Sequence, residues 1–248
     1  MQDGIRHPPR LLHIGAAQSS KKPKQLSSKK TNCMRTWIKI CGTTSLEDAL
    51  SSIEAGADAL GFIFAPSKRR ILPENAQKII RELPPNIEKI GVFMDAGAMG
   101  IRQVIREAEL TGIQMHGEGE FPPEVYSYLP EDRRDKLRKI KTLIVWQDFE
   151  RNFDSYAAVP GVVDTWLFDS GAGSGQTFDW QSVRAKLGER QGQFVVAGGL
   201  NPQNVGDAIR TFKPWGVDVV SGVEREPGRK DPEKLKAFVA AVRKAEQI

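Results

Sequence analysis

Short apolar runs recur along the chain from Met34 onward, and each is followed by a more polar stretch with the spacing of a helix. Eight of these runs have the length and the β-branched or aromatic content typical of strands. They span residues 37–41, 58–64, 89–94, 113–116, 139–145, 163–168, 194–197 and 216–220. Neighbouring runs start about 20 to 31 residues apart, which is the length of a strand, a turn and a helix. The pattern therefore predicts a succession of βα units.

The stretches between the runs carry helix start and stop signals. Ser45 is followed three positions later by an acidic residue, a spacing typical of a helix start, and Asp231-Pro232 predicts the start of the last helix. Pro202 predicts a first helical turn in the same way. Gly56 and Gly112 are expected to end helices, because glycine readily adopts the left-handed conformation found there.

Eight βα units within about 215 residues predict a single (β/α)₈ barrel, the TIM-barrel fold. The same alternation occurs in a doubly wound open sheet, so periodicity alone leaves that alternative open. The count of eight favours the barrel, and no linker-like stretch interrupts the pattern. We expect one barrel domain over residues 34–248, preceded by an extension over residues 1–33.

The basic character of the chain belongs to this extension. The whole chain has a net charge of +5, but residues 1–33 hold seven Lys and Arg residues and one acidic residue, which gives 7 − 1 = +6. Residues 34–248 therefore carry 36 − 7 = 29 basic and 31 − 1 = 30 acidic residues. Because the excess lies outside the barrel, we expect no nucleic-acid partner. Richness in Lys, Ser and Pro without periodicity predicts that the extension is disordered.

Three origins of the extension remain open: a translation start assigned too early, with Met34 as the true start, an organellar transit peptide, or a functional basic arm. The extension lacks the apolar core of a secretory signal. No apolar run of the chain approaches the ~18 residues that span a membrane. We therefore expect no membrane partner and a cytoplasmic location, or an organellar one if residues 1–33 are a transit peptide.

In a (β/α)₈ barrel, chemistry gathers at the C-terminal ends of the strands, and the first predicted strand ends in Cys41. Strand alternation places Lys39 and Cys41 on the inward face, with branched Ile38 and Ile40 toward the helices. A buried, inert cysteine is the alternative. An inward Lys39 needs a partner, and Asp218 on the neighbouring eighth strand is expected to form an ion pair with it.

Other chemically active residues follow the remaining strands. Asp169 comes directly after a buried run, where a carboxylate needs a partner or a role; a helix cap or a loop ion pair is the alternative. Arg69 offers a bidentate fork for a substrate carboxylate, unless it lies in a solvated basic loop. Gln114 and His116 are candidates to donate hydrogen bonds to a substrate, and a structural histidine is equally expected. With two cysteines and no His and Cys cluster of metal-ligand spacing, we expect neither a disulfide framework nor a metal site.

Two pairs containing glycine follow the last two strands, Gly198-Gly199 and Ser221-Gly222. Glycine lets backbone N–H groups approach an anion, and barrels commonly bind phosphate at these two loops. Plain turn glycines explain either pair alone, but together the pairs predict a phosphorylated small-molecule substrate. The stretch Gly171–Gly175 predicts a mobile loop that closes over the substrate, with a simple flexible linker as the alternative.

Several motifs coincide in one order along the chain. They are KICG (39–42), GADALGFIF (56–64), SKR (67–69), GVFMD (91–95), QMHGE (114–118), FDS and GSGQTFDW within 168–180, GGLNPQNV (198–205), and VDVVSGVE and PGRKD within 217–231. With these motifs, residues 35–245 resemble the phosphoribosylanthranilate isomerase family of tryptophan biosynthesis. The resemblance implies a catalytic (β/α)₈ barrel, monomeric or homodimeric, that needs neither metal nor organic cofactor. It implies an Amadori rearrangement of N-(5-phosphoribosyl)anthranilate to 1-(2-carboxyphenylamino)-1-deoxyribulose 5-phosphate.

The resemblance also implies roles for three residues: Cys41 as general base, Asp169 as general acid and Arg69 as the contact to the anthranilate carboxylate. A carboxyl group acts as an acid here if a dry site holds its pKa up. Free cysteine titrates near ~8.5, so the base requires positive surroundings, which Lys39 is expected to supply. The sequence departs from the family at Ala197, where a serine is common, and in the extension.

Two other functions remain open. The first is another phosphate-binding barrel enzyme, such as a histidine-pathway sugar-phosphate isomerase. Those enzymes typically work with paired aspartates, so Cys41 argues against them. The second is an inactive barrel that serves as a binding or scaffolding module, against which Cys41, Asp169 and the glycine loops argue.

A protein that begins at Met34 is expected to keep the full activity of the complete chain, because residues 1–33 contribute nothing to the predicted barrel. Steady-state isomerase rates of the two proteins, compared at equal concentration, test this. A loss of catalysis in the shorter protein would show that residues 1–33 are a functional arm.

Overall fold

The computed structural model describes residues 35–117, 124–127, 129–145, 149–158, 161–171, 177–190 and 192–247. All the described residues belong to one compact unit within residues 33–248. The predicted disorder of residues 1–33 lies outside the described residues. So does the predicted mobile loop beyond Gly171, and both stay predictions.

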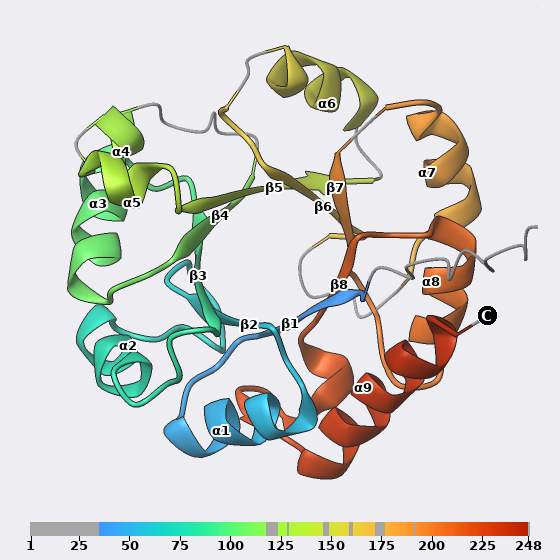
Figure 1. Ribbon diagram of the computed structural model, residues 1–248, viewed down its shortest axis with the longest axis horizontal. Coiled ribbons are helices and arrows are strands. Elements are labelled where there is room, and N and C mark those ends of the chain that lie inside the picture. Colours follow the sequence, from blue (N-terminus) through green and yellow to red (C-terminus); the bar gives the residue numbers. More distant parts are fainter. Residues whose placement is uncertain are drawn as a thin grey trace, which may run out of the picture. The chain divides into compact units, whose positions relative to one another are not determined.

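Within the described ranges, eight parallel strands close into a barrel in chain order (Figure 1). The strands are β1 (Trp37–Cys41), β2 (Ala59–Ile63), β3 (Glu88–Met94), β4 (Gly112–His116), β5 (Arg138–Ile144), β6 (Thr165–Asp169), β7 (Gln193–Val196) and β8 (Gly216–Val219). Each strand overlaps one predicted run. Because β1 pairs with β8 and closes the ring, the predicted (β/α)₈ barrel is confirmed and the open sheet is excluded.

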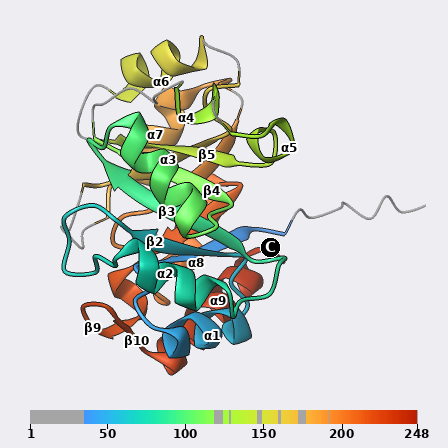
Figure 2. The same cartoon turned by 90° about the vertical axis from the view of Figure 1, so that its left-hand side faces the viewer.

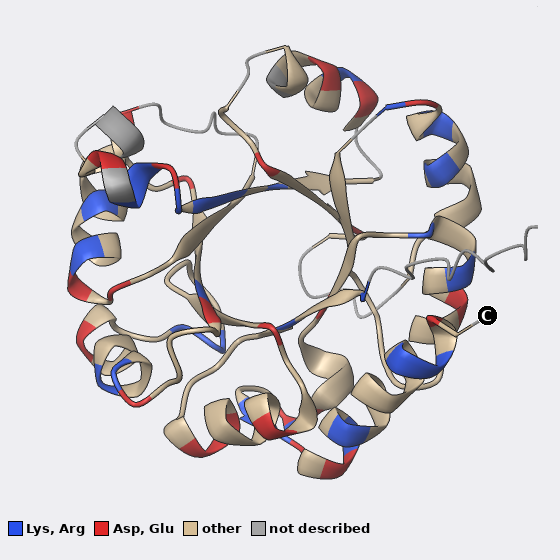
Figure 3. Cartoon of the chain, viewed as in Figure 1, with Lys and Arg blue, Asp and Glu red and all other residues tan. Residues whose placement is uncertain are grey.

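Helices surround the barrel on its outer side (Figures 1 and 2). They are α1 (Leu46–Ala55), α2 (Pro73–Ile80), α3 (Ala98–Glu107), α4 (Glu124–Ser127), α5 (Glu131–Arg134), α6 (Phe149–Ala157), α7 (Trp180–Leu187), α8 (Val205–Phe212) and α9 (Pro232–Ala245). Between β8 and α9 lie the short 3₁₀ helix η1 (Ser221–Val223) and a hairpin of β9 (Glu224–Glu226) and β10 (Arg229–Lys230). Figure 3 shows that both signs of charge occur on the helices around the ring.

Three of the predicted helix boundaries are confirmed. The Ser45 side chain accepts a hydrogen bond from the backbone N–H of Asp48 and so caps α1. Asp231 caps α9 in the same way. Gly56 ends α1 with a left-handed φ of 111°, a conformation that an L side chain would strain.

Two predicted boundaries were wrong. Pro202 lies in a turn in which the Asn201 side chain accepts hydrogen bonds from the backbone N–H groups of Gln203 and Asn204, and α8 begins only at Val205. Gly112 is the first residue of β4, not a helix end. Glycine is needed there by close packing, since a Cβ would lie 2.5 Å from Ile90 Cδ1.

Strand alternation sorts the buried residues into two layers. Trp37, Ile90, Leu167 and Val195 belong to the cluster inside the barrel. The larger cluster between strands and helices contains the residues of opposite parity, such as Ile38. Each fully buried aliphatic side chain stabilises the fold by about 1.5–3 kcal/mol. The predicted parity of the first strand is confirmed.

Stacked tryptophans close the N-terminal end of the barrel. The ring centroids of Trp37 and Trp215 lie 5.1 Å apart. The Arg138 guanidinium lies 5.0 Å from the centroid of the Trp215 ring and forms an ion pair with Glu88. The C-terminal ends of the strands are therefore the end at which a substrate can reach the barrel interior.

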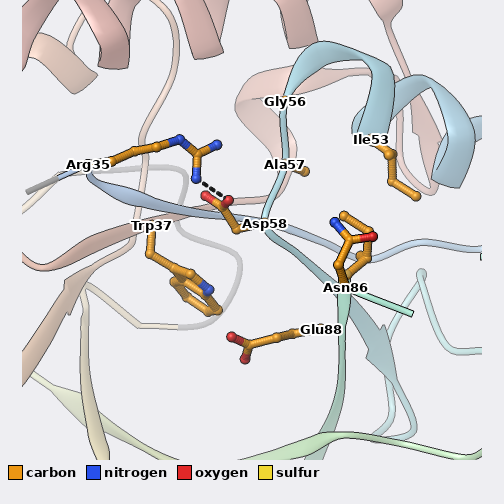
Figure 4. A pocket seen from close by; sticks show the side chains of 9 residues that line it. Arg35, Trp37, Ile53, Gly56, Ala57, Asp58, Asn86 and Glu88 are labelled. Atoms are coloured by element: carbon orange, nitrogen blue, oxygen red, sulfur yellow. Dashed lines mark hydrogen bonds and ion pairs between the residues drawn. The ribbon is translucent and has the colours of Figure 1, made fainter. Parts of the chain in front are cut away.

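A cavity of about 460 Å³ borders this aromatic plug (Figure 4). Trp37 at the start of β1, Asp58 just before β2 and Glu88 at the start of β3 line it, so it lies at the end of the strands opposite to Cys41. Its carboxylates are engaged, since Asp58 forms an ion pair with Arg35 and Glu88 is already paired. The cavity is therefore separate from the residues expected to carry chemistry.

The last helix is tied to the start of the first strand. The backbone N–H of Thr36 donates to Glu246 Oε1 at 2.7 Å, and Arg243 Nη1 donates to the backbone oxygen of Thr36 at 2.9 Å. Closure of the ring thus involves α9 as well as the pairing of β1 with β8.

A buried ion pair links β1 to β8 inside the barrel. Lys39 and Asp218 are register partners, and Lys39 Nζ lies 2.9 Å from Asp218 Oδ1, so the predicted pair is confirmed. The lysine is 0% exposed. Burial alone disfavours its charged form, but Asp218 and the Cys41 thiol outweigh burial and raise the pKa of Lys39 above its ordinary value. The lysine therefore stays charged.

Removing one partner of this pair is expected to leave an uncompensated buried charge. Lys39→Met should lower the free energy of unfolding by about 3–5 kcal/mol, and adding Asp218→Leu should restore much of that loss. The matched control is Lys236→Met, which removes an exposed ion pair with Glu233 and should cost about 0–1 kcal/mol. Denaturant-induced unfolding measures all three proteins, and equal effects of Lys39→Met and Lys236→Met would contradict the expectation.

Candidate active site

Cys41 is the last residue of β1 and lies buried at the C-terminal end of the barrel. Its register partner on β2 is Gly61. A Cβ at that glycine would lie 2.5 Å from Cys41 Sγ, so the missing side chain provides the space for the sulfur. The inward orientation expected for the thiol agrees with this contact.

The surroundings of the thiol act on its pKa in opposite directions. Burial raises the pKa of Cys41 above its ordinary value, and Asp218 raises it further. Lys39, which contacts the thiol, lowers the pKa but does not offset burial. The expected positive influence of Lys39 is therefore present, yet the thiol is mainly protonated at neutral pH.

Asp169 is the last residue of β6, and its side chain is half-buried. Asp169 Oδ1 accepts a hydrogen bond from the backbone N–H of Gly171 at 2.8 Å. Burial raises the pKa of the carboxyl group, the Gly171 N–H opposes this rise, and Asp218 adds to it. Asp169 and Cys41 thus both interact with the ion pair below them in the barrel.

Gln114 and His116 lie on the inward side of β4 and contact each other. Gln114 Nε2 lies 3.1 Å from His116 Nε2 and donates to Thr142 Oγ1 at 3.1 Å. Among the described residues, the buried Oε1 of Gln114 has no hydrogen-bond partner. Burial, together with the nearby charge of Lys39, lowers the pKa of His116 to about 4. The imidazole is therefore neutral and can donate one hydrogen bond.

Lys141 on β5 extends the same wall of the site. Its side chain is buried, and Nζ donates to the backbone oxygen of Gly117 at 3.0 Å. Burial lowers the pKa of Lys141 to about 8, although the carboxylate of Asp95 opposes the shift. The sequence reading placed Lys141 in a strand without assigning it to the site.

Gly198 and Gly199 follow β7 in left-handed conformations, with φ of 77° and 62°. A Cβ at Gly198 would lie 2.5 Å from Ser170 Oγ, so close packing by itself requires glycine there. Within the described part of the chain, the backbone N–H groups of both glycines donate to no other group. Free N–H groups of this kind can bind an anion.

Ser221 and Gly222 begin η1 directly after β8, and Ser221 is exposed. A Cβ at Gly222 would lie 1.9 Å from the backbone oxygen of Leu200. The loops that follow β7 and β8 are therefore in backbone contact. The structure brings both glycine pairs together at one side of the barrel mouth.

Arg69 lies in the loop after β2 and is half-buried rather than solvated. Its guanidinium donates to both carboxylate oxygens of Glu224, with Nη2 at 2.7 Å from Oε2. The Arg69 side chain passes over Gly42, the residue that follows Cys41. The alternative of a solvated basic loop is excluded for Arg69.

Sequence reasoning missed three further residues of this region: Gly61, Glu224 and Lys230. A glycine inside a strand pattern signals close approach of another group, so Gly61 was detectable in principle. Glu224 and Lys230 lie in the short strands β9 and β10, and neither was assigned a role from the sequence. Lys230 is nevertheless buried, and its Nζ donates to the backbone oxygen of Cys41 at 2.6 Å.

The described residues contain neither a cluster of metal-ligating side chains nor a helix that could span a membrane. No group of three or more His, Cys, Asp and Glu side chains there is arranged to hold a metal ion. In the same residues, every helix is too short or too polar to cross a membrane.

The fold and this arrangement define a (β/α)₈-barrel enzyme whose thiol and carboxyl groups lie at one barrel mouth beside two glycine loops. The model of the N-(5'phosphoribosyl)anthranilate (PRA) isomerase family matches residues 38–241. The N-(5'-phosphoribosyl)anthranilate isomerase of Geobacter sp. (strain M21) is 43% identical over 216 residues, which cover 84% of this chain and 98% of the relative.

Solved structures agree with this match. A phosphoribosyl anthranilate isomerase in complex with reduced 1-(o-carboxyphenylamino)-1-deoxyribulose 5-phosphate has a TM-score of 0.69 at 38% identity and covers 84% of this chain and 99% of its own. Monomers of the dimeric enzyme from Thermotoga maritima give a TM-score of 0.67 at 36% identity, with 84% and 99% covered. The chain belongs to the PRA isomerase family. This membership argues against the alternative of a histidine-pathway sugar-phosphate isomerase.

His116 is expected to titrate near pH 4 in the folded protein. An unperturbed histidine has a pKa near ~6.5, so between these values the unfolded chain binds the proton more tightly. Stability should therefore fall as the pH drops through this window, by at most about 3 kcal/mol. An NMR titration of the imidazole, assigned by comparison with His116→Gln, measures the pKa, and a midpoint above pH 6 would contradict the burial argument.

Proposed function

We propose that this protein isomerises N-(5-phosphoribosyl)anthranilate to 1-(2-carboxyphenylamino)-1-deoxyribulose 5-phosphate, with Cys41 as general base and Asp169 as general acid. The observation that carries the proposal is the placement of this thiol and this carboxyl group at the ends of β1 and β6, above one buried ion pair. Membership of the PRA isomerase family supplies the reaction.

The acid step is assigned to Asp169. Burial raises the pKa of its carboxyl group, which increases the share of the protonated form. Its proton passes to the ring oxygen of the ribose, and the bond from that oxygen to C1 breaks. The lone pair of the anthranilate nitrogen forms a double bond to C1 as that bond breaks, which gives an iminium ion that keeps its N–H, and the sugar becomes an open chain.

The base step is assigned to Cys41 in its thiolate form. The thiolate removes the proton from C2 of the sugar, and the electrons form a C1=C2 double bond while the iminium nitrogen regains its lone pair and becomes neutral. The resulting enolamine takes up a proton at C1 and loses one from the C2 hydroxyl, which gives the ketone. No atoms are gained or lost, and the scheme needs no metal or organic cofactor.

Substrate binding is assigned to the rest of the barrel mouth. We assign the phosphate to the loops of Gly198-Gly199 and Ser221-Gly222, because the free N–H groups there suit an anion. Arg69, Gln114 and His116 are assigned to the anthranilate end of the substrate. The phosphorylated compound bound to the related structure supports a ligand of this kind.

Assembly and location are further parts of the proposal. The dimeric state of the Thermotoga maritima relative favours a homodimer over a monomer. The absence of a nucleic-acid partner and the cytoplasmic location, or an organellar one if residues 1–33 are a transit peptide, stay predictions.

Complementation of a tryptophan auxotroph that lacks the isomerase tests the function. The wild-type chain should restore growth, whereas Cys41→Ala and Asp169→Asn should fail and should lower kcat of the purified enzyme by about 100-fold or more. Cys33→Ala and Asp207→Asn, an exposed aspartate of α8, are the matched controls and should behave as wild type.

Failure of the wild type to rescue would refute the reaction and favour the inactive-scaffold alternative. Growth with both Cys41→Ala and Asp169→Asn would instead refute the assignment of acid and base while leaving the reaction in place.

A further inference from the structure

The guanidinium of Arg69 is held along one edge by a buried carboxylate. Arg69 Nε lies 2.9 and 3.0 Å from the two oxygens of Glu224, and Nη2 lies 2.7 Å from Oε2. The Glu224 residue is 6% exposed. Within the described residues, Arg69 Nη1 donates to no group. The outer edge of the fork therefore remains available to a ligand.

The same carboxylate is fixed from its other side. Lys230 Nζ lies 3.1 Å from Glu224 Oε1, and the backbone N–H of Gly228 donates to that oxygen at 3.2 Å. Lys230 in turn donates to the backbone oxygen of Cys41 at 2.6 Å. Glu224 is thus rigidly placed and connected to the strand end that carries the thiol.

The cluster of Arg69, Lys230 and Glu224 carries an unbalanced charge. Burial would raise the pKa of Glu224, but Arg69 and Lys230 outweigh burial and bring it below its ordinary value, so the carboxylate stays ionised. Two cations and one anion leave one positive charge in excess. A single carboxylate on a ligand would neutralise this cluster.

Gly42 gives the Arg69 side chain the room that it occupies. This residue has a left-handed φ of 79°, and a Cβ there would lie 2.8 Å from Arg69 Cδ. The glycine lets the arginine stem cross directly over the end of β1. The stem of Arg69 is therefore held against the residue that follows Cys41.

We propose that Glu224 is a positioning residue that aims the free edge of Arg69 at the carboxylate of the substrate, so that the site selects an aromatic acid rather than an uncharged aromatic amine. This inference rests on the proposed function. An ion pair that served stability alone would need one cation, and buried pairs contribute little to stability. Here Glu224 binds two cations, Arg69 and Lys230. Arg69 packs against Gly42, and Lys230 donates a hydrogen bond to the backbone oxygen of Cys41.

A thermodynamic cycle of Glu224→Gln, Arg69→Gln and the double variant tests the proposal with N-(5-phosphoribosyl)anthranilate as substrate. Glu224→Gln should raise KM about tenfold or more and change kcat less than about threefold. The double variant should have the KM of Arg69→Gln within about twofold, because Glu224 acts through Arg69. Glu226→Gln makes the same charge change on the exposed side of the same hairpin and should leave both constants unchanged.

Multiplicative effects of the two substitutions on KM, or a loss confined to kcat, would overturn the proposal. If thermal unfolding shows that Glu224→Gln does not fold, Glu224→Asp takes its place in the cycle, since it keeps the charge and withdraws the carboxylate from Arg69 by one methylene. A wild-type protein without isomerase activity refutes the proposed function. An active wild type with multiplicative effects refutes this inference alone.

Discussion

The Lys39–Asp218 ion pair links the closure of the barrel to the electrostatics of the site. It joins the first strand to the last beside the apolar cluster of the barrel interior, where either charge alone would be very costly. The same two charges act on the chemistry above them. Lys39 favours the ionised forms of Cys41 and Asp169, and Asp218 disfavours them. One structural element therefore affects both folding and acid–base balance.

Much of the remaining site depends on glycines, whose missing side chains leave room for neighbouring atoms. Gly61 gives room to the Cys41 sulfur, Gly42 gives room to the Arg69 stem, and Gly222 allows two loops to touch. A methyl group at any of these positions would meet another atom at less than 3 Å. Such contacts restrict how the strand ends can pack at the barrel mouth, and so help to fix the positions of the Cys41 thiol and of the loops after β7 and β8.

The sequence correctly predicted those features that follow from strand alternation and from the order of strands in a closed barrel. Alternation with a period of two turned Lys39 inward, and adjacency of strands one and eight in a closed barrel identified Asp218 as its partner. The helix predicted to start at Pro202 begins at Val205 instead, after a turn in which the Asn201 side chain accepts hydrogen bonds from backbone N–H groups. The direction of the Cys41 pKa shift was missed as well, since burial depends on neighbours from distant parts of the chain.

The closure of the ring has a consequence for the order of folding during synthesis. Lys39 and Asp218 are 179 residues apart in the chain. A growing polypeptide therefore exposes one unpaired edge of β1, and a lysine without its counter-ion, until β8 and then α9 have left the ribosome. Until the ring closes, the exposed edge of β1 is a site at which incomplete chains can aggregate.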